Sequence, residues 1–148
     1  MDKKKVVLIT GSSSGFGLLT ARTLLEQGYT VIASMRGLDG KNKEHADSLK
    51  TFAEGKPGKL HLLELDVTSD SSVETAVKQA IEIAGRIDVV INNAGFGVAG
   101  FAEATTIPQF QKNFDVNVFG VQRVSRAVLP AMRKQGTGLI INISSIVG

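Results

Sequence analysis

The residue types best suited to chemistry lie near the amino terminus, where T-G-S-S-S-G-F-G at residues 10–17 follows the apolar run at residues 6–9. A glycine-rich turn between a strand and a helix directs backbone N–H groups and the positive end of the helix dipole at a phosphate. Gly11 would reverse the chain, Gly15 would admit a pyrophosphate, and Gly17 would let the helix pack on the sheet. We therefore expect a dinucleotide-phosphate site at Gly11, Ser13, Ser14, Gly15, Phe16 and Gly17.

The spacing of these glycines, G-x-x-x-G-x-G, differs from both common phosphate-binding patterns. It is neither the G-x-G-x-x-G dinucleotide fingerprint nor the G-x-x-x-x-G-K-S/T loop. No lysine follows Gly17, which disfavours nucleoside triphosphate hydrolysis. A serine/glycine turn that binds nothing is the alternative interpretation of this stretch alone.

The elements that position this turn alternate along the chain. Short apolar runs are typical of strands buried on both faces of a parallel sheet, whereas apolar residues three and four apart indicate helices. The predicted strands are residues 6–10, 29–34, 60–65, 87–92 and 139–144. The predicted helices are residues 16–27, 41–54 and 71–85, and a long helix from Thr106 that Pro130 and Gly136 bring to an end, with Phe110, Phe114, Asn117, Val121, Val124 and Val128 facing inward.

Alternating strands and helices with right-handed crossovers predict an α/β fold, a Rossmann-type doubly wound parallel sheet in the strand order 3-2-1-4-5. We interpret residues 1–148 as one dinucleotide-binding domain of this type. Ligands bind such sheets at the carboxyl ends of the strands, around the point where the strand order reverses. The turn at residues 10–17, Arg36, Asp66, residues 92–95 and residues 144–145 all follow strands, so we expect them at one crevice.

The second strand ends in Ser34-Met35-Arg36, where dinucleotide-binding folds commonly place an acid that holds a ribose 2′-hydroxyl. Met35 takes the place of that acid, so nothing there repels a 2′-phosphate, and the guanidinium of Arg36 can bind one. This pattern predicts NADP(H) in preference to NAD(H). An exposed loop arginine without a ligand is the alternative.

Composition excludes several other classes of protein. The chain has no cysteine, so it has neither disulfides nor thiolate ligands, and His45 and His61 are isolated, so no metal site is predicted. The sequence has no basic face with interleaved aromatic residues, so a nucleic-acid partner is not expected. No run approaches the roughly 18 apolar residues of a membrane span, and we expect a cytoplasmic protein.

Five motifs in order along nearly the whole chain resemble the short-chain dehydrogenase/reductase family. They are T-G-S-S-S-G-F-G at residues 10–17, L-D-V-T at 65–68, N-N-A-G at 92–95, D-V-N-V at 115–118 and N-I-S-S at 142–145. The resemblance implies hydride transfer between a nicotinamide cofactor and a small carbonyl or alcohol substrate. It also implies a homo-oligomer in the full-length protein.

The resemblance also implies roles for residues on the cofactor side of the site. Asp66 would accept a hydrogen bond from the adenine amino group beside the backbone of Val67. Asn93, Ala94 and Gly95 would pass along the cofactor. The alternative for Asp66 is a residue that only forms the turn at the end of the strand, and the asparagine pair at residues 92–93 could tie adjacent strands together.

The resemblance implies catalytic roles for two further residues. By resemblance, Asn117 supports a catalytic lysine through a water, and Ser145 donates a hydrogen bond to the substrate carbonyl. The alternatives are a core asparagine bonded to backbone and a serine that ends a strand. Phe96, Val98 and Phe101 could form an apolar wall, which favours a hydrophobic ketone or alcohol.

The family's Y-x-x-x-K motif, which supplies the proton donor, is absent from this sequence. Its only tyrosine, Tyr29, is followed four residues later by Ala33 instead of lysine. The apolar run at residues 139–143 is typical of a strand in the middle of a sheet, yet it would form an edge here. We therefore expect the amino-terminal part of a longer reductase, carboxy-terminally incomplete and inactive alone. A non-catalytic dinucleotide-binding protein or a truncated remnant is the alternative.

Overall fold

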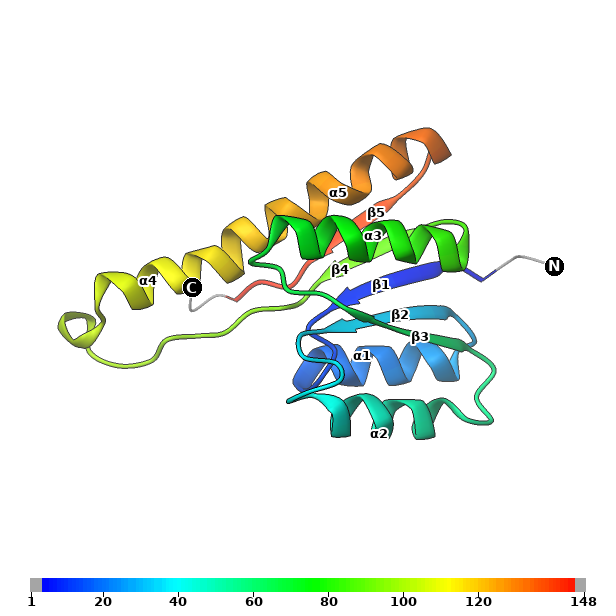
Figure 1. Ribbon diagram of the computed structural model, residues 1–148, viewed down its shortest axis with the longest axis horizontal. Coiled ribbons are helices and arrows are strands. Elements are labelled where there is room, and N and C mark those ends of the chain that lie inside the picture. The colour runs from blue at the N-terminus through cyan, green and yellow to red at the C-terminus, as the bar shows by residue number, and fades with distance from the viewer. Residues whose placement is uncertain (1–3, 146–148) are drawn as a thin grey trace.

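The computed structural model describes residues 4–145 and shows five strands and the helices between them (Figure 1). The strands are β1 (Val6–Thr10), β2 (Thr30–Met35), β3 (Lys59–Glu64), β4 (Val89–Asn92) and β5 (Leu139–Asn142). The α-helices are α1 (Gly15–Glu26), α2 (Lys43–Ala53), α3 (Asp70–Ala84), α4 (Ile107–Phe114) and α5 (Gly120–Gln135). A 3₁₀ turn (Ala102–Ala104) precedes α4, and a π-helical segment (Asp115–Phe119) joins α4 to α5.

The strands form one parallel sheet in the order β3-β2-β1-β4-β5, which confirms the predicted topology. The reversal point lies between β1 and β4, where Leu8 pairs with Val90. The chain therefore leaves the carboxyl ends of β1 and β4 side by side, at the same edge of the sheet. That is the position at which a parallel α/β sheet binds ligands.

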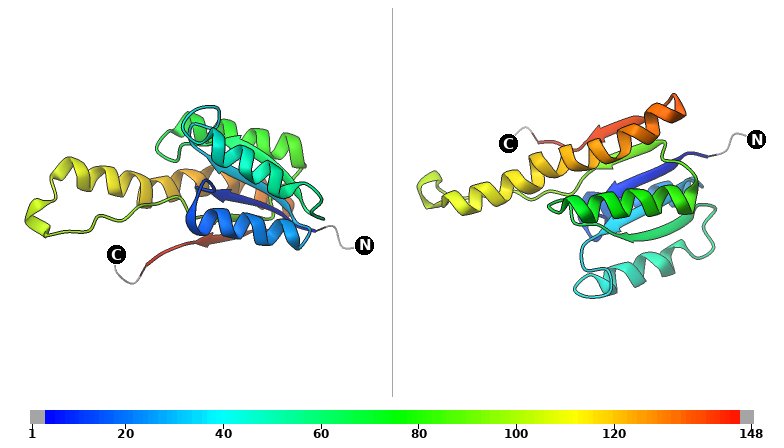
Figure 2. Two further views of the ribbon diagram at one scale, coloured as in Figure 1. Left: turned by 90° about the horizontal axis from the view of Figure 1, so that it is seen from below. Right: turned by 45° about the horizontal axis from the view of Figure 1, so that its top comes forward.

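Helices cover both faces of the sheet (Figure 2). On one face, α1 and α2 bury Ala21, Leu25 and Leu49 against β1, β2 and β4. On the other face, α3 and α5 bury two rows of side chains against the sheet and against each other. These rows are Val73, Ala76, Val77 and Ala80 from α3, and Val124, Val128 and Met132 from α5. The central strands are apolar on both faces because both faces are covered.

The predicted long helix differs from the structure in two respects. The π-helical segment interrupts it, which shifts the side chains that face inward: Phe110 and Phe114 are exposed, while Val116 and Met132 are buried. The helix also continues through Pro130, which lies exposed, and it ends at Gly136, whose φ of 70° is left-handed. Burial of side chains on either side of Pro130 maintains the helix despite the missing N–H.

The helix α4 and the loop before it extend beyond the carboxyl edge of the sheet (Figure 1). They are therefore positioned to form a wall next to the strand ends rather than to cover the sheet. Among the residues that the structure describes, no helix is both long enough and apolar enough to cross a membrane.

Candidate functional site

The turn after β1 packs tightly against the end of β4. Gly11 has a φ of 70°, and an added Cβ there would lie 2.8 Å from the Cα of Ala94. The Nδ2 of Asn93 donates hydrogen bonds to the carbonyl oxygens of Thr10 (3.0 Å) and Gly11 (3.1 Å). An added Cβ on Gly17 would overlap the carbonyl oxygen of Gly11. The glycines at these two positions thus allow strand, turn and helix to approach closely.

The hydroxyl of Thr10 also joins the two strand ends. Its Oγ1 accepts hydrogen bonds from the backbone N–H groups of Asn93 and Ala94, both at 3.0 Å. Thr10 is 1% exposed, so these two N–H groups supply its buried hydroxyl oxygen with partners. In addition, Asn92 donates to Asn142 across β4 and β5 at 2.9 Å. The asparagine pair therefore ties adjacent strands together, and this role is compatible with cofactor contact.

The first turn of α1 has the features of an anion-binding helix terminus. Its N-cap residue, Ser14, makes no side-chain hydrogen bond to the turn, and the turn contains no acidic residue. Gly15 has a φ of 54°, and an added Cβ there would meet no atom within 4 Å. Backbone N–H groups of a first turn have no partner inside the helix. This geometry is open to a phosphate and fits the diphosphate of a dinucleotide.

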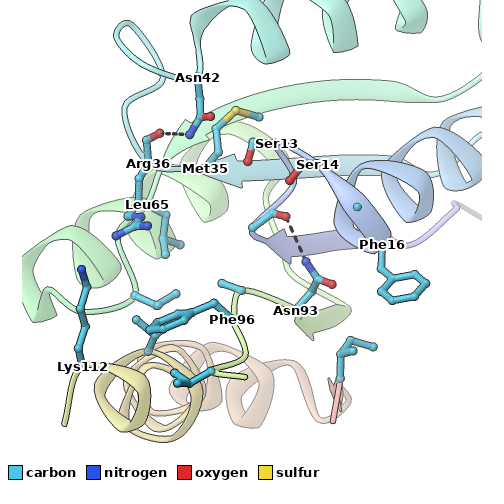
Figure 3. Close-up of a pocket in the computed structure, with 18 of the residues that line it drawn as sticks. Ser13, Ser14, Phe16, Met35, Arg36, Asn42, Leu65, Asn93, Phe96 and Lys112 are labelled. Atoms are coloured by element: carbon cyan, nitrogen blue, oxygen red, sulfur yellow. Dashed lines mark hydrogen bonds between the residues drawn. The ribbon is translucent and has the colours of Figure 1, made fainter. Parts of the chain in front are cut away.

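A crevice of about 730 Å³ opens at this edge of the sheet (Figure 3). The ends of β1, β2 and β4, the first turn of α1, the helix α4 and the segment after β5 contribute to its wall. The residues that line it are Gly11, Ser13, Ser14, Gly15, Phe16, Met35, Arg36, Asn42, Leu65, Val67, Asn93, Ala94, Gly95, Phe96, Val98, Gln109, Lys112, Val116 and Ile143. The structure thus brings most of the predicted cofactor residues together in one place.

Four of the predicted cofactor-binding and catalytic residues do not line this crevice. Gly17 lies behind the turn against Gly11, and Asp66 faces its own turn. Asn117 and Ser145, the two predicted catalytic residues, are exposed nearby but outside the lining. Their functional roles stay predictions.

Several lining residues were not predicted from the sequence. They are Asn42, Leu65, Gln109, Lys112, Val116 and Ile143. Gln109 and Lys112 belong to α4, and Figure 3 shows Lys112 extending on the side of the crevice where Arg36 lies. Leu65, Val116 and Ile143 each lie within one of the motifs, but apolar residues in a motif do not stand out from core residues.

Arg36 lines the crevice and directly follows β2. The preceding residue, Met35, is buried, whereas the side chain of Arg36 is 49% exposed. Its nearest carboxylate is Asp66, at 3.9 Å between Nη1 and Oδ2, which is a weak exposed ion pair. The carbonyl of Arg36 accepts a hydrogen bond of 2.6 Å from Nδ2 of Asn42. The backbone of Arg36 is therefore held while its guanidinium stays accessible.

Asp66 organises the turn after β3. Its Oδ1 accepts hydrogen bonds from the N–H (2.9 Å) and the hydroxyl (2.8 Å) of Thr68. Burial alone would raise the pKa of the Asp66 carboxyl, but the bonds from Thr68 and the charges of Arg36 and Lys41 together lower it. The carboxylate is therefore ionised at neutral pH and acts only as an acceptor.

Asn117 lies in the π-helical segment and is exposed, which corrects the prediction that it faces the core. The extra residue in the π turn rotates its side chain away from the buried stripe. Its Oδ1 accepts from the N–H of Phe96 (3.1 Å), and its Nδ2 donates to the carbonyl of Phe96 (2.8 Å). Asn113 donates to the same carbonyl at 2.8 Å. Asn117 thus fixes the backbone of a residue that lines the crevice.

The apolar wall is smaller than predicted. Phe96 and Val98 line the crevice, but Phe101 is 79% exposed and lies outside it. Phe101 directly precedes the 3₁₀ turn, where the loop extends away from the sheet. Ile143, which follows β5, takes part in the lining instead.

Residues 5–148 match the family described as short chain dehydrogenase. The chain belongs to the short-chain dehydrogenase family. It is 43% identical to 3-ketodihydrosphingosine reductase from Bacteroides thetaiotaomicron over 97% of this chain and 48% of that protein. It is 40% identical to retinol dehydrogenase 8 from Bos taurus over 99% of this chain and 46% of that protein.

A solved structure of a similar protein has the same fold. The alcohol dehydrogenase from Thermococcus sibiricus, solved in complex with 5-hydroxy-NADP, superimposes with a TM-score of 0.81 and is 32% identical. The match covers 94% of this chain and 57% of that chain. The chain spans about half the length of the curated relatives it matches. Proteins of the short-chain dehydrogenase family are oxidoreductases that in general use NAD(P).

Proposed function

We propose that this chain carries the cofactor half of an oxidoreductase that transfers a hydride between NADP(H) and a carbonyl or alcohol substrate. The observation that carries the preference for NADP(H) is Arg36, an accessible cation at the end of β2, where Met35 takes the place of the acid. The weak ion pair with Asp66 leaves the guanidinium able to contact a phosphate. The complex of the Thermococcus sibiricus enzyme with an NADP derivative supports this choice.

The remaining parts of the cofactor have matching surroundings. The turn after β1 and the first turn of α1 would hold the diphosphate through backbone N–H groups. Asp66 and the backbone of Val67 would bind the adenine, and Asn93, Ala94 and Gly95 would pass along the nicotinamide half. When bound, the nicotinamide supplies the hydride chemistry. Gly17 supports the site from behind by letting α1 approach the turn.

The catalytic proposal rests on two residues. Ser145 would donate a hydrogen bond to the substrate carbonyl and stabilise the charge that develops on its oxygen. Asn117 would hold the loop at Phe96, to which it is hydrogen-bonded, and support the proton donor system. A tyrosine and a lysine would come from outside these residues.

We further propose an apolar ketone or alcohol as the substrate class. Phe96, Val98 and Ile143 form an apolar part of the crevice wall. Two relatives are named for 3-ketodihydrosphingosine and retinol, and the long hydrocarbon part of such molecules would fit an apolar wall. Exposed apolar side chains on α4 and α5, among them Phe110, Phe114 and Leu129, support a homo-oligomer. A cytoplasmic location stays a prediction.

The substitution Arg36→Ala tests the cofactor preference. A charge-assisted contact to a 2′-phosphate contributes about 1.5–3 kcal/mol, so its loss should weaken NADPH binding roughly tenfold or more. NADH, which has no 2′-phosphate, should bind with unchanged affinity. Titration of both cofactors by nicotinamide fluorescence measures the ratio, and an unchanged ratio would contradict the proposal. Exposed Arg133, far along α5, gives a control substitution to alanine that should leave both affinities unchanged.

A further inference from the structure

The loop that follows β2 is held by a residue outside the crevice. The carboxylate of Glu64 accepts hydrogen bonds from the backbone N–H groups of Gly37 and Leu38, each at 2.7 Å and each on a different oxygen. Glu64 is the last residue of β3 and pairs with Met35 in the parallel register. Its side chain therefore joins β3 to the two peptides that directly follow Arg36.

The same loop is closed by bonds within itself. The carbonyl of Gly37 accepts hydrogen bonds from the N–H groups of Gly40 (3.0 Å) and Asn42 (2.9 Å). Gly37 has a φ of 62°, in the left-handed region that glycine adopts most readily. Asn42 in turn bonds the carbonyl of Arg36. The loop thus has a defined shape, and Glu64 anchors that shape to the sheet.

We propose that Glu64 is a positioning residue for cofactor selectivity: its two hydrogen bonds fix the loop so that Arg36 faces the place of a cofactor 2′-phosphate. Glu64 does not line the crevice, so it would act through the backbone on either side of Gly37 and not by contact with the cofactor. This inference rests on the proposed function of Arg36. A flexible loop would present the guanidinium only part of the time, which lowers the apparent affinity by that fraction.

The charge of Glu64 and its positioning role have opposite effects on NADPH affinity, so an experiment can tell them apart. A carboxylate near the binding site of a phosphate repels it, so removal of the charge alone would tighten NADPH binding. The positioning role predicts the opposite. In Glu64→Gln an amide nitrogen replaces one acceptor oxygen and faces a backbone N–H, so one charge-assisted bond is lost. In Glu64→Asp the charge stays, but the side chain is too short by one methylene to reach both N–H groups.

The experiment is a fluorescence titration of the purified protein with NADPH and NADH. For Glu64→Gln and Glu64→Asp we expect the NADPH affinity to fall about fivefold, the factor supplied by one net hydrogen bond, with NADH affinity changed less than about twofold. Glu44→Gln is the matched control, because this exposed glutamate in the first turn of α2 follows the same loop and has no ion pair among the described residues. It should leave the ratio of the two affinities unchanged.

Arg36→Ala separates failure of this inference from failure of the proposed function. If Arg36→Ala leaves the ratio unchanged, the proposed preference for NADP(H) is wrong. Suppose instead that Arg36→Ala lowers the ratio of NADPH affinity to NADH affinity. The positioning role is then wrong if both Glu64 variants leave this ratio unchanged, or if Glu64→Gln raises it. In the double variant Arg36→Ala/Glu64→Gln we expect no loss beyond that of Arg36→Ala, because Glu64 acts through Arg36. An additive loss would overturn the inference.

Discussion

Gly17→Ala is the substitution whose effect can be worked out most fully from the structure. An added Cβ would overlap the carbonyl oxygen of Gly11 and lie 2.5 Å from Nδ2 of Asn93. Movement of the Asn93 side chain relieves only the second contact and breaks its two hydrogen bonds to the carbonyls of Thr10 and Gly11. The first contact is with backbone, so the turn, which is itself packed against β4, must shift as well.

The loss of these two partly buried bonds costs about 2–3 kcal/mol. The higher helix propensity of alanine offsets up to about 1 kcal/mol, so the loss of these bonds leaves a net destabilisation of about 1–3 kcal/mol, to which the shift of the turn adds. For a chain of this size each kcal/mol lowers Tm by roughly 2–4 °C, so Tm should fall by at least roughly 2 °C. Because the same turn forms the proposed diphosphate site, NADPH affinity should also fall about tenfold or more.

Thermal unfolding and NADPH titration measure the two effects on the same preparation. Gly97→Ala is the control, because an added Cβ there meets no atom within 4 Å. It should change neither Tm nor affinity. A Gly17→Ala protein that unfolds at the wild-type temperature and binds NADPH with wild-type affinity would refute this account of the turn.

Three further predictions concern Thr10 and Asn117, near the crevice, and His61, in the edge strand β3. Thr10→Val removes the hydroxyl that accepts hydrogen bonds from two backbone N–H groups. Chemical denaturation should show a free energy of unfolding that is lower by about 2–4 kcal/mol. The control Thr106→Val, at a helix N-cap, should lower it by only about 1 kcal/mol. Asn117→Ala removes both hydrogen bonds to the backbone of Phe96 and should increase hydrogen exchange at the N–H of Phe96. Unchanged protection of that N–H would contradict the role of Asn117 in fixing the backbone of Phe96. Burial, and then the charge of Lys59, lowers the pKa of His61, so the unfolded chain binds the proton more readily and stability should fall as pH decreases below 6.5. His61→Gln should reduce that slope in unfolding experiments between pH 5 and 7, about the range in which histidine titrates.

The sequence allowed correct prediction of those parts of the site that depend on local patterns and topology. Glycine spacing predicted the turn around Gly11 and Gly15, and the alternation of strands and helices predicted the order of the sheet. Once the order is known, the carboxyl ends of the strands must meet, so the sequence predicts that Arg36 and Asn93 lie at one crevice, as the structure confirms. These features are predictable because each depends on a period or a spacing that is visible in the chain.

The parts that were not predicted depend on geometry without such a signature. A regular helical period cannot reveal the π-helical segment, so Asn117 was expected in the core and is exposed. Lys112 lines the crevice because α4 extends past the sheet, which no local pattern encodes. The bonds of Glu64 depend on the register of β3 against β2 and on the conformation of Gly37.

The most direct test of the proposed function is the affinity of the purified wild-type protein for the two reduced cofactors, measured side by side by nicotinamide fluorescence. We expect NADPH to bind at least about tenfold more tightly than NADH, because Arg36 offers a 2′-phosphate a contact that a hydroxyl cannot match. Equal affinities, or tighter binding of NADH, would contradict the proposed NADP(H) preference. Failure of the protein to bind either cofactor would contradict the proposed site as a whole.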